Sequence, residues 1–248
     1  ELALDWDRAH SAYQALIGVT SGTYKILTED KLKFKDGTNP DLDDQVTLAL
    51  MNGRDALNKV NADDRTNVAI ARENIIVSIV SGFLKGTLGE VGGLINNRNS
   101  DVDEATVEQK EAELLYRTVE IFIAQDNPAD NGVIKAQLTG DLVNVVANEI
   151  VIEISKGVIG QVRRNISQIE STFGVDKGQA TLATERVSLY VNIFLPDLEL
   201  RLGSLQRVEM QNALQDLKEA IRTDDSSKAS VAGSTIIEII SAYENELI

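Results

Sequence analysis

The chain has 248 residues, of which 43% are hydrophobic and 25% are charged, a balance typical of a folded globular protein. Its 39 acidic residues outnumber 24 Lys and Arg residues, and the formal net charge of −15 argues against binding to nucleic acid or to an anionic membrane surface. The absence of cysteine excludes disulfides, thiolate metal ligands and a cysteine nucleophile. No apolar run approaches the roughly 18 residues of a membrane span, so the sequence predicts none.

The location of the protein is suggested by composition. The first residue is Glu and not Met, the chain is acidic, and it has no cysteine. The Glu start is expected of either a mature protein after signal removal or a chain trimmed at this residue, and the acidity and the absence of cysteine are compatible with an exported protein. We therefore expect an extracellular, cell-surface or periplasmic location.

Helical periodicity dominates the chain. Apolar residues recur at spacings of three and four, and only three prolines occur, so the sequence predicts an all-α protein. An irregular segment is expected at 29–43, and a helix beginning near 177 is expected to kink or restart at Pro196. The other expected helices, in chain order, are residues 3–28, 43–59, 63–94, 103–125, 133–173, 204–222 and 227–247.

Three nearly uninterrupted β-branched cores recur, at Ile75–Val80, Ile150–Ile154 and Ile236–Ile240. A Tyr-centred apolar segment precedes each core, and such internal repetition is typical of scaffold proteins. We expect an elongated bundle of about seven to nine helices built from three diverged helical-hairpin units. A strand assignment for the cores stays open, because β-branched residues also favour sheets. The three tyrosines are Tyr13, Tyr116 and Tyr190, and the three units are residues 1–95, 101–173 and 177–248, expected to form one continuous bundle.

Two segments carry further structural expectations. From Leu142 to Ile154 apolar residues face nearly every direction, which indicates a helix surrounded by others. From Ile159 to Phe173 the apolar residues lie on one narrow helix face, at spacings of three and four, and this pattern resembles a coiled-coil seam. If 133–173 is one helix, it is about 60 Å long. Glycines between 82 and 93 indicate a smooth helix face and a place where the helix breaks or curves.

The polar feature with most chemical interest is a set of three glutamates. Glu149 and Glu153 lie four residues apart on one helical face of the most apolar segment, and Glu238 matches Glu153 in the third core. Carboxylates on facing helices can coordinate a hard cation or share a proton. The alternative is that each glutamate reaches solvent or forms an ion pair with an arginine.

Other motifs are weaker. His10 is the only histidine and has no second ligand nearby, so we expect a partly exposed helix residue. Gly82–Thr87 has the composition of a phosphate-binding loop, but its lysine precedes the glycine and no strand precedes the motif. The acidic turns at 41–44, 101–104 and 126–130 lack the spacing of a calcium loop. We expect them to cap helices.

One short segment resembles a known family. Asp5–Tyr13, with its Trp, Arg and Tyr, is similar to the first helices of imelysin-like extracellular bundles, a family linked to iron uptake. The resemblance covers about ten residues and implies an exported helical bundle. That family's Gly-x-His-x-x-Glu motif is absent, because Tyr13 and not Glu stands three residues after His10. No site is therefore carried over.

These observations predict a protein that works by interaction. One histidine, no cysteine and no recognisable nucleophile offer little to an enzyme. We expect a non-catalytic, exported or cell-surface helical scaffold without a cofactor. Its partners are expected to be proteins, including copies of itself in a homo-oligomer or in a polymer such as a filament or lattice. The alternative is an extracellular carboxylate-based metal-binding protein for iron or calcium that uses Glu149, Glu153 and Glu238.

Overall fold

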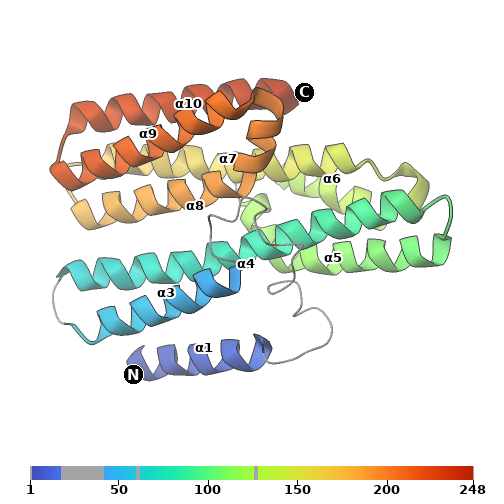
Figure 1. Cartoon of the computed structure of the whole chain (residues 1–248), viewed down its shortest axis with the longest axis horizontal. Coiled ribbons are helices and arrows are strands. Elements are labelled where there is room, and N and C mark those ends of the chain that lie inside the picture. The colour runs from blue at the N-terminus through green and yellow to red at the C-terminus, as the bar shows by residue number, and fades with distance from the viewer. Residues whose placement is uncertain (1, 18–41, 60–61, 126–127, 248) are drawn as a thin grey trace. The chain divides into compact units, whose positions relative to one another are not determined.

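The structure is a computed structural model that describes residues 2–17, 42–59, 62–125 and 128–247. These residues form nine α-helices and one short 3₁₀ helix and contain no strand, which confirms the all-α prediction (Figure 1). The expected continuation of the first helix to residue 28 and the irregular segment up to 41 lie outside the described residues. In chain order the elements are α1 (Leu2–Ile17), α3 (Leu42–Leu57), α4 (Ala62–Asn97), α5 (Val102–Ala124), α6 (Pro128–Thr139), η2 (Leu142–Asn144), α7 (Ala147–Thr172), α8 (Lys177–Leu202), α9 (Ser204–Thr223) and α10 (Ser226–Leu247).

All three β-branched cores are helical, in α4, α7 and α10, so the strand alternative is wrong. A β-branched side chain disfavours a helix by well under about 1 kcal/mol, and burial of one helix face outweighs that cost. The tyrosines of the preceding segments are buried as core residues: Tyr13, Tyr116 and Tyr190. The relation of the three units as repeats stays a prediction.

The helices pack into two compact units. Unit 1 comprises residues 1–121 and 132–151, and unit 2 comprises residues 122–131 and 152–248. Helices α5, α6 and α7 each contribute residues to both units. The sequence boundary expected near residue 100 therefore lies inside unit 1, and the one expected near residue 175 lies inside unit 2.

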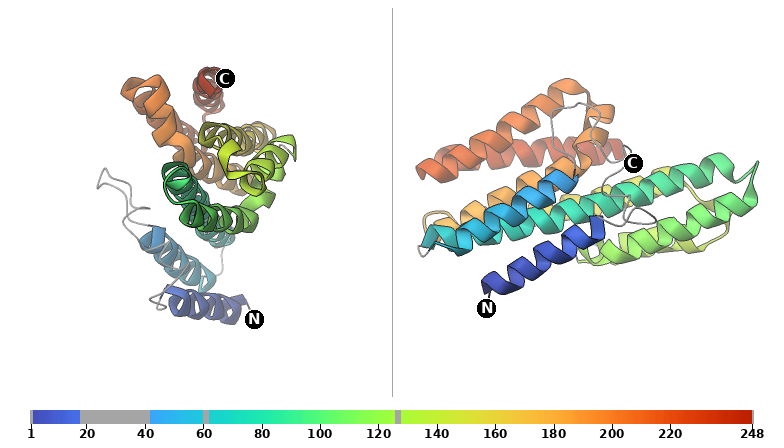
Figure 2. Two further views of the ribbon diagram at one scale, coloured as in Figure 1. Left: turned by 90° about the vertical axis from the view of Figure 1, so that its right-hand side faces the viewer. Right: turned by 60° about the horizontal axis from the view of Figure 1, so that its bottom comes forward.

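Unit 1 is organised around α4, which packs along α3, while α1 packs against α3 (Figures 1 and 2). A small core joins these three helices: Tyr13, Val46 and Leu50, with Trp6, Ile75 and Ile79 packed against it. The glycines of α4 do not break the helix, which continues to Asn97. The expected smooth glycine face is only partly in close contact with another helix. A Cβ at Gly93 would clash with Glu108 of α5, whereas a Cβ at Gly89 or Gly92 would have no atom within 4 Å.

Helix α4 also differs from the sequence expectation about membranes. Within Asp64–Asn97 it has a stretch of mean hydropathy 1.4, long and apolar enough to cross a bilayer, and 44% of that stretch is buried inside the structure. Core helices of soluble proteins meet the same two criteria, so length and composition alone do not establish a span. The same stretch holds Lys85, and burial lowers the pKa of its ammonium group to about 8.

The predicted long helix over 133–173 is wrong. The chain forms α6, leaves the helix at Gly140, and enters α7 only at Ala147. Side chains from elsewhere in unit 1 take up the freed backbone groups: Gln109 donates to the Gly140 carbonyl (2.9 Å) and Arg98 to that of Val145 (2.9 Å). Val143 is 71% exposed, so this stretch is not a helix surrounded by others. Tertiary hydrogen bonds here outweigh an apolar pattern.

Unit 2 holds α8, α9 and α10 side by side with most of α7 (Figure 1). The seam predicted from Ile159 to Phe173 lies in unit 2, and four of its residues are buried as a packing seam requires: Ile159, Val162, Ile166 and Ile169. Helix α8 continues through the exposed Pro196 without restarting. Its N-terminus is capped by Asp176, whose carboxylate accepts from the Gln179 N–H (3.0 Å).

Candidate functional site

The three candidate metal ligands have different surroundings. Glu149 belongs to unit 1, is exposed, and accepts a hydrogen bond from Gln137. Glu238, on α10 of unit 2, is also exposed. Glu153 is half-buried in unit 2 and pairs with Lys156, one turn further along α7 (3.0 Å). Across the described ranges, no three His, Cys, Asp or Glu side chains come together as a metal site requires, and the metal alternative stays a prediction.

A different carboxylate meets Glu153. Asp130, in the first turn of α6 and only 7% exposed, forms a hydrogen bond with Glu153. The pKa of Asp130 is raised to about 7, first by burial and then by the hydrogen bond and negative charge of Glu153, against the opposing effect of Lys156. The Asp130 carboxyl therefore holds a proton below neutral pH and donates it in the hydrogen bond to Glu153. The expectation that the acidic turn at 126–130 only caps a helix is therefore incomplete, since Asp130 forms a hydrogen bond with Glu153 of α7.

A polar network crosses the core of unit 2. The Tyr243 hydroxyl on α10 donates to the Asp197 carboxylate on α8 (2.6 Å) and lies 3.1 Å from the Ser155 hydroxyl on α7. Arg201 donates to the same Asp197 oxygen (2.7 Å). The Tyr243 ring stacks on Phe194, with centroids 5.4 Å apart. Burial and the bond to Asp197 raise the pKa of Tyr243, so its hydroxyl stays protonated.

This network positions helices and offers no reactive group. Tyr243 is fully buried, and its hydroxyl is shared between two partners, so it has no access to a substrate. Sequence reasoning missed it, although a signal exists: Asp197 and Arg201 stand four residues apart, the spacing of an ion pair on one helix face. Nothing in a single sequence pairs either of them with Tyr243, 46 residues from Asp197.

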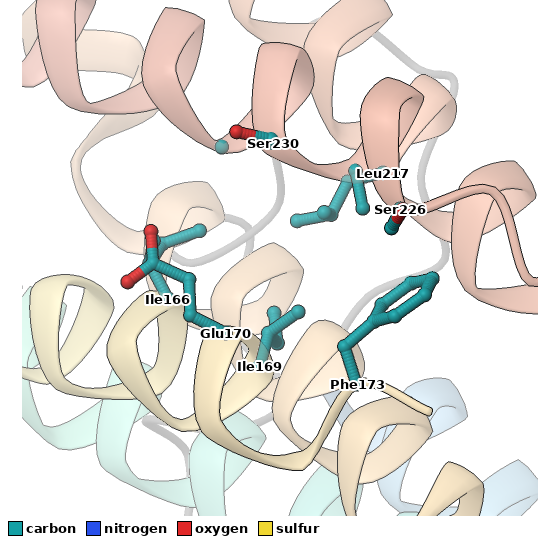
Figure 3. Close-up of a pocket in the computed structure, with 9 residues that line it drawn as sticks. Ile166, Ile169, Glu170, Phe173, Leu217, Ser226 and Ser230 are labelled. Carbon is teal, nitrogen blue, oxygen red and sulfur yellow. The ribbon is translucent and has the colours of Figure 1, made fainter. Parts of the chain in front are cut away.

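A pocket of 330 Å³ lies between α7, α9 and α10 of unit 2 (Figure 3). Its walls include Ile166, Ile169 and Leu217, all buried, and Glu170 and Phe173 lie at opposite edges. The sequence identified the isoleucines as part of a packing seam. A pocket forms at this end of the seam because the residues of α10 that face it are small. The periodicity of α7 does not reveal this.

Helix α5 carries several exposed apolar side chains. Val107, Leu114 and Ile121 are 50%, 63% and 69% exposed and repeat every seven residues, so they form one row along the helix. We call these three residues the α5 row. A second exposed set, Leu200, Leu205 and Val208, lies around the turn from α8 to α9 in unit 2. The heptad spacing of the α5 row is visible in the sequence, but its exposure is not.

The remaining motifs are structural. His10 lies partly exposed on α1, 3.4 Å from Gln14. Gly82–Thr87 lies within continuous α4, as the expectation of helix packing requires. Asp101 caps α5 by accepting from the Glu104 N–H (3.1 Å). The turn at 41–44 is only partly within the described residues.

Comparisons of the chain with models of protein families, with curated proteins and with solved structures find no match. Function must therefore be inferred from the described residues themselves. Those residues provide the α5 row, the exposed set at Leu200, Leu205 and Val208, and several pockets, among them the one between α7, α9 and α10.

Proposed function

We propose that this protein is a non-catalytic interaction protein, exported or held at the cell surface, that self-assembles through its helices. The observation that carries the proposal is the α5 row. Large apolar side chains scattered singly on a surface are ordinary, whereas three aligned along one helix indicate a contact with another molecule. The row extends over about 21 Å of helix, a length that a second helix can cover.

Charges beside the α5 row favour another copy of the same helix as the partner. Between Val107 and Ile121, one side of the row carries the exposed cations Lys110 and Arg117, and the other side carries Glu111. Two such helices packed parallel about a two-fold axis place the cations of one copy beside the glutamate of the other. Antiparallel packing instead brings like charges together, which is unfavourable. The charge pattern thus favours a parallel pair.

We expect the association through the α5 row to be weak, and a larger assembly to need a second contact. Glu113 already pairs with Lys110 (2.9 Å) and lies 3.6 Å from Arg117, which reduces the attraction available to a second copy. A single row also buries less area than a stable interface of about 1,200 Å² or more. A two-fold contact closes on itself, so a filament or lattice requires a second contact. The exposed set at Leu200, Leu205 and Val208 supplies a candidate for it.

Cysteine cross-linking tests the contact sharply, because the chain has no native cysteine. In a parallel pair each residue of the α5 row faces its own copy, so Val107→Cys forms a disulfide-linked dimer under mild oxidation. In an antiparallel pair centred on Leu114, Val107 faces Ile121 of the other copy, and only Leu114→Cys cross-links. Val231→Cys, at a site 65% exposed on α10, measures random collision.

Sedimentation velocity over a range of concentrations measures the association itself. Leu114→Glu is expected to weaken it at least about tenfold, since a charge replaces the central apolar contact, and to leave the circular dichroism unchanged because Leu114 is exposed. A strict monomer at the highest concentration, or cross-linking of Val107→Cys no faster than that of Val231→Cys, contradicts the proposal.

A further inference from the structure

The pocket between α7, α9 and α10 has the walls of a small-molecule site. Ile166, Ile169, Leu217 and Ala229 are 5%, 3%, 1% and 7% exposed, so its floor is apolar. The volume of 330 Å³ equals that of roughly ten water molecules in the liquid and lies at the small end of the range for ligand pockets.

The mouth of the pocket is polar and carries one charge. Ser226 and Ser230 of α10 are exposed at the rim, and Glu170 is the only charged residue of the lining. Glu170 makes no hydrogen bond or ion pair with any residue that the structure describes. Its carboxylate lies at one edge of the pocket and the ring of Phe173 at the other (Figure 3). An unpaired carboxylate above an apolar floor attracts a cation that has an apolar body.

We propose that this pocket binds a small organic ammonium ion, with its apolar body against Ile169 and Leu217 and its ammonium group beside Glu170. The Phe173 ring adds a face that attracts organic cations. The formal charge of −15 raises the concentration of such cations around the whole protein. Inorganic cations gain nothing from the apolar floor, and organic anions are repelled by Glu170.

Three probes of similar size separate charge from shape: phenethylammonium, 2-phenylethanol and phenylacetate. Calorimetric titration of the full chain gives their dissociation constants, and amide chemical shifts locate the binding. We expect phenethylammonium to bind at least about fivefold more tightly than the alcohol, and phenylacetate to bind least, with the largest shifts at residues 166–173 and 226–233.

Matched variants test whether Glu170 causes the preference for phenethylammonium over 2-phenylethanol. Glu170→Gln is expected to abolish the advantage of phenethylammonium over the alcohol. Glu209→Gln makes the same charge change at another exposed position, on α9, and is expected to leave the advantage intact. Gly233→Ala tests the floor without unfolding the protein, because its Cβ would stand 3.7 Å from Ile166. This variant is expected to weaken the binding of both the amine and the alcohol, because the added methyl group reduces the volume of the pocket. Equal affinity for the amine and the alcohol, an unchanged preference in Glu170→Gln, or shifts elsewhere would overturn the proposal.

Discussion

At the scale of single residues, Tyr243 joins three helices of unit 2. Its ring packs on Phe194 of α8, while its hydroxyl contacts Asp197 of α8 and Ser155 of α7. Since Tyr243 donates to Asp197, the Ser155 hydroxyl is the donor in their shared hydrogen bond. One side chain of α10 therefore joins three helices, and it does so with every polar atom satisfied.

Removal of that hydroxyl is expected to be costly. Tyr243→Phe keeps the stacked ring but leaves the buried Ser155 and part of Asp197 without a partner, which lowers the free energy of unfolding by about 1–3 kcal/mol. Urea unfolding measures the loss. In the double variant with Ser155→Ala the two losses should not add, because both remove the same hydrogen bond. Strict additivity would show that the hydroxyls do not interact.

At the scale of helices, close approach is decided by particular glycines. The indole of Trp6 on α1 lies directly over Gly53 of α3 and donates to the Leu50 carbonyl (2.7 Å). A Cβ at Gly53 would stand only 1.9 Å from the indole ring. The contact between α1 and α3 therefore depends on a residue without a side chain.

The single tryptophan of the chain makes this contact measurable. Gly53→Ala is expected to displace the Trp6 indole into water, with a red shift of its fluorescence and a loss of about 1–3 kcal/mol in the free energy of unfolding. Gly89→Ala on α4 is the control, because its Cβ meets no atom. It should leave the emission unchanged and stabilise the helix by about 0.5–1 kcal/mol. Unchanged emission in Gly53→Ala would contradict the described packing.

At the scale of the whole molecule, stability depends on the proton held by Asp130. Its pKa is raised from 3.8 to about 7 on folding, so the folded protein keeps a proton that the unfolded chain releases. This contribution to stability is complete below pH 3.8, declines as the pH rises, and is lost above about 7. Glu153 and Lys156 are the charged groups that face Asp130.

Asp130→Asn tests this dependence. The amide stays neutral and still donates a hydrogen bond to Glu153, so the variant should be more stable than the native protein near neutral pH and should lose less stability between pH 4 and pH 7. Thermal unfolding across this range measures the effect. Glu238→Gln, at an exposed site of α10, is the control and should follow the native profile. Parallel profiles for Asp130→Asn and the native protein would refute the assignment.

The sequence by itself determined the helices and most of their buried faces. A spacing of three and four predicts helices at most of the described positions, and the row from Ile159 to Ile169 is buried as predicted, because the period of an apolar stripe reports which side of a helix faces the core. The same reasoning failed at 140–146. There the apolar pattern continues, but the helix ends before Gly140, a residue typical of helix ends, and Gln109 and Arg98, distant in sequence, supply hydrogen bonds to the non-helical backbone.

Only the tertiary structure decided which helices meet and what lies between them. The pairing of Tyr243 with Asp197, of Asp130 with Glu153 and of Trp6 with Gly53 joins residues separated by 23 to 47 positions. The exposure of the α5 row was likewise decided by packing, since an apolar side chain at helical spacing has the same pattern whether it is covered or not. Periodicity is a local property of a helix, whereas pockets, carboxyl pairs and exposed rows arise from contacts between helices.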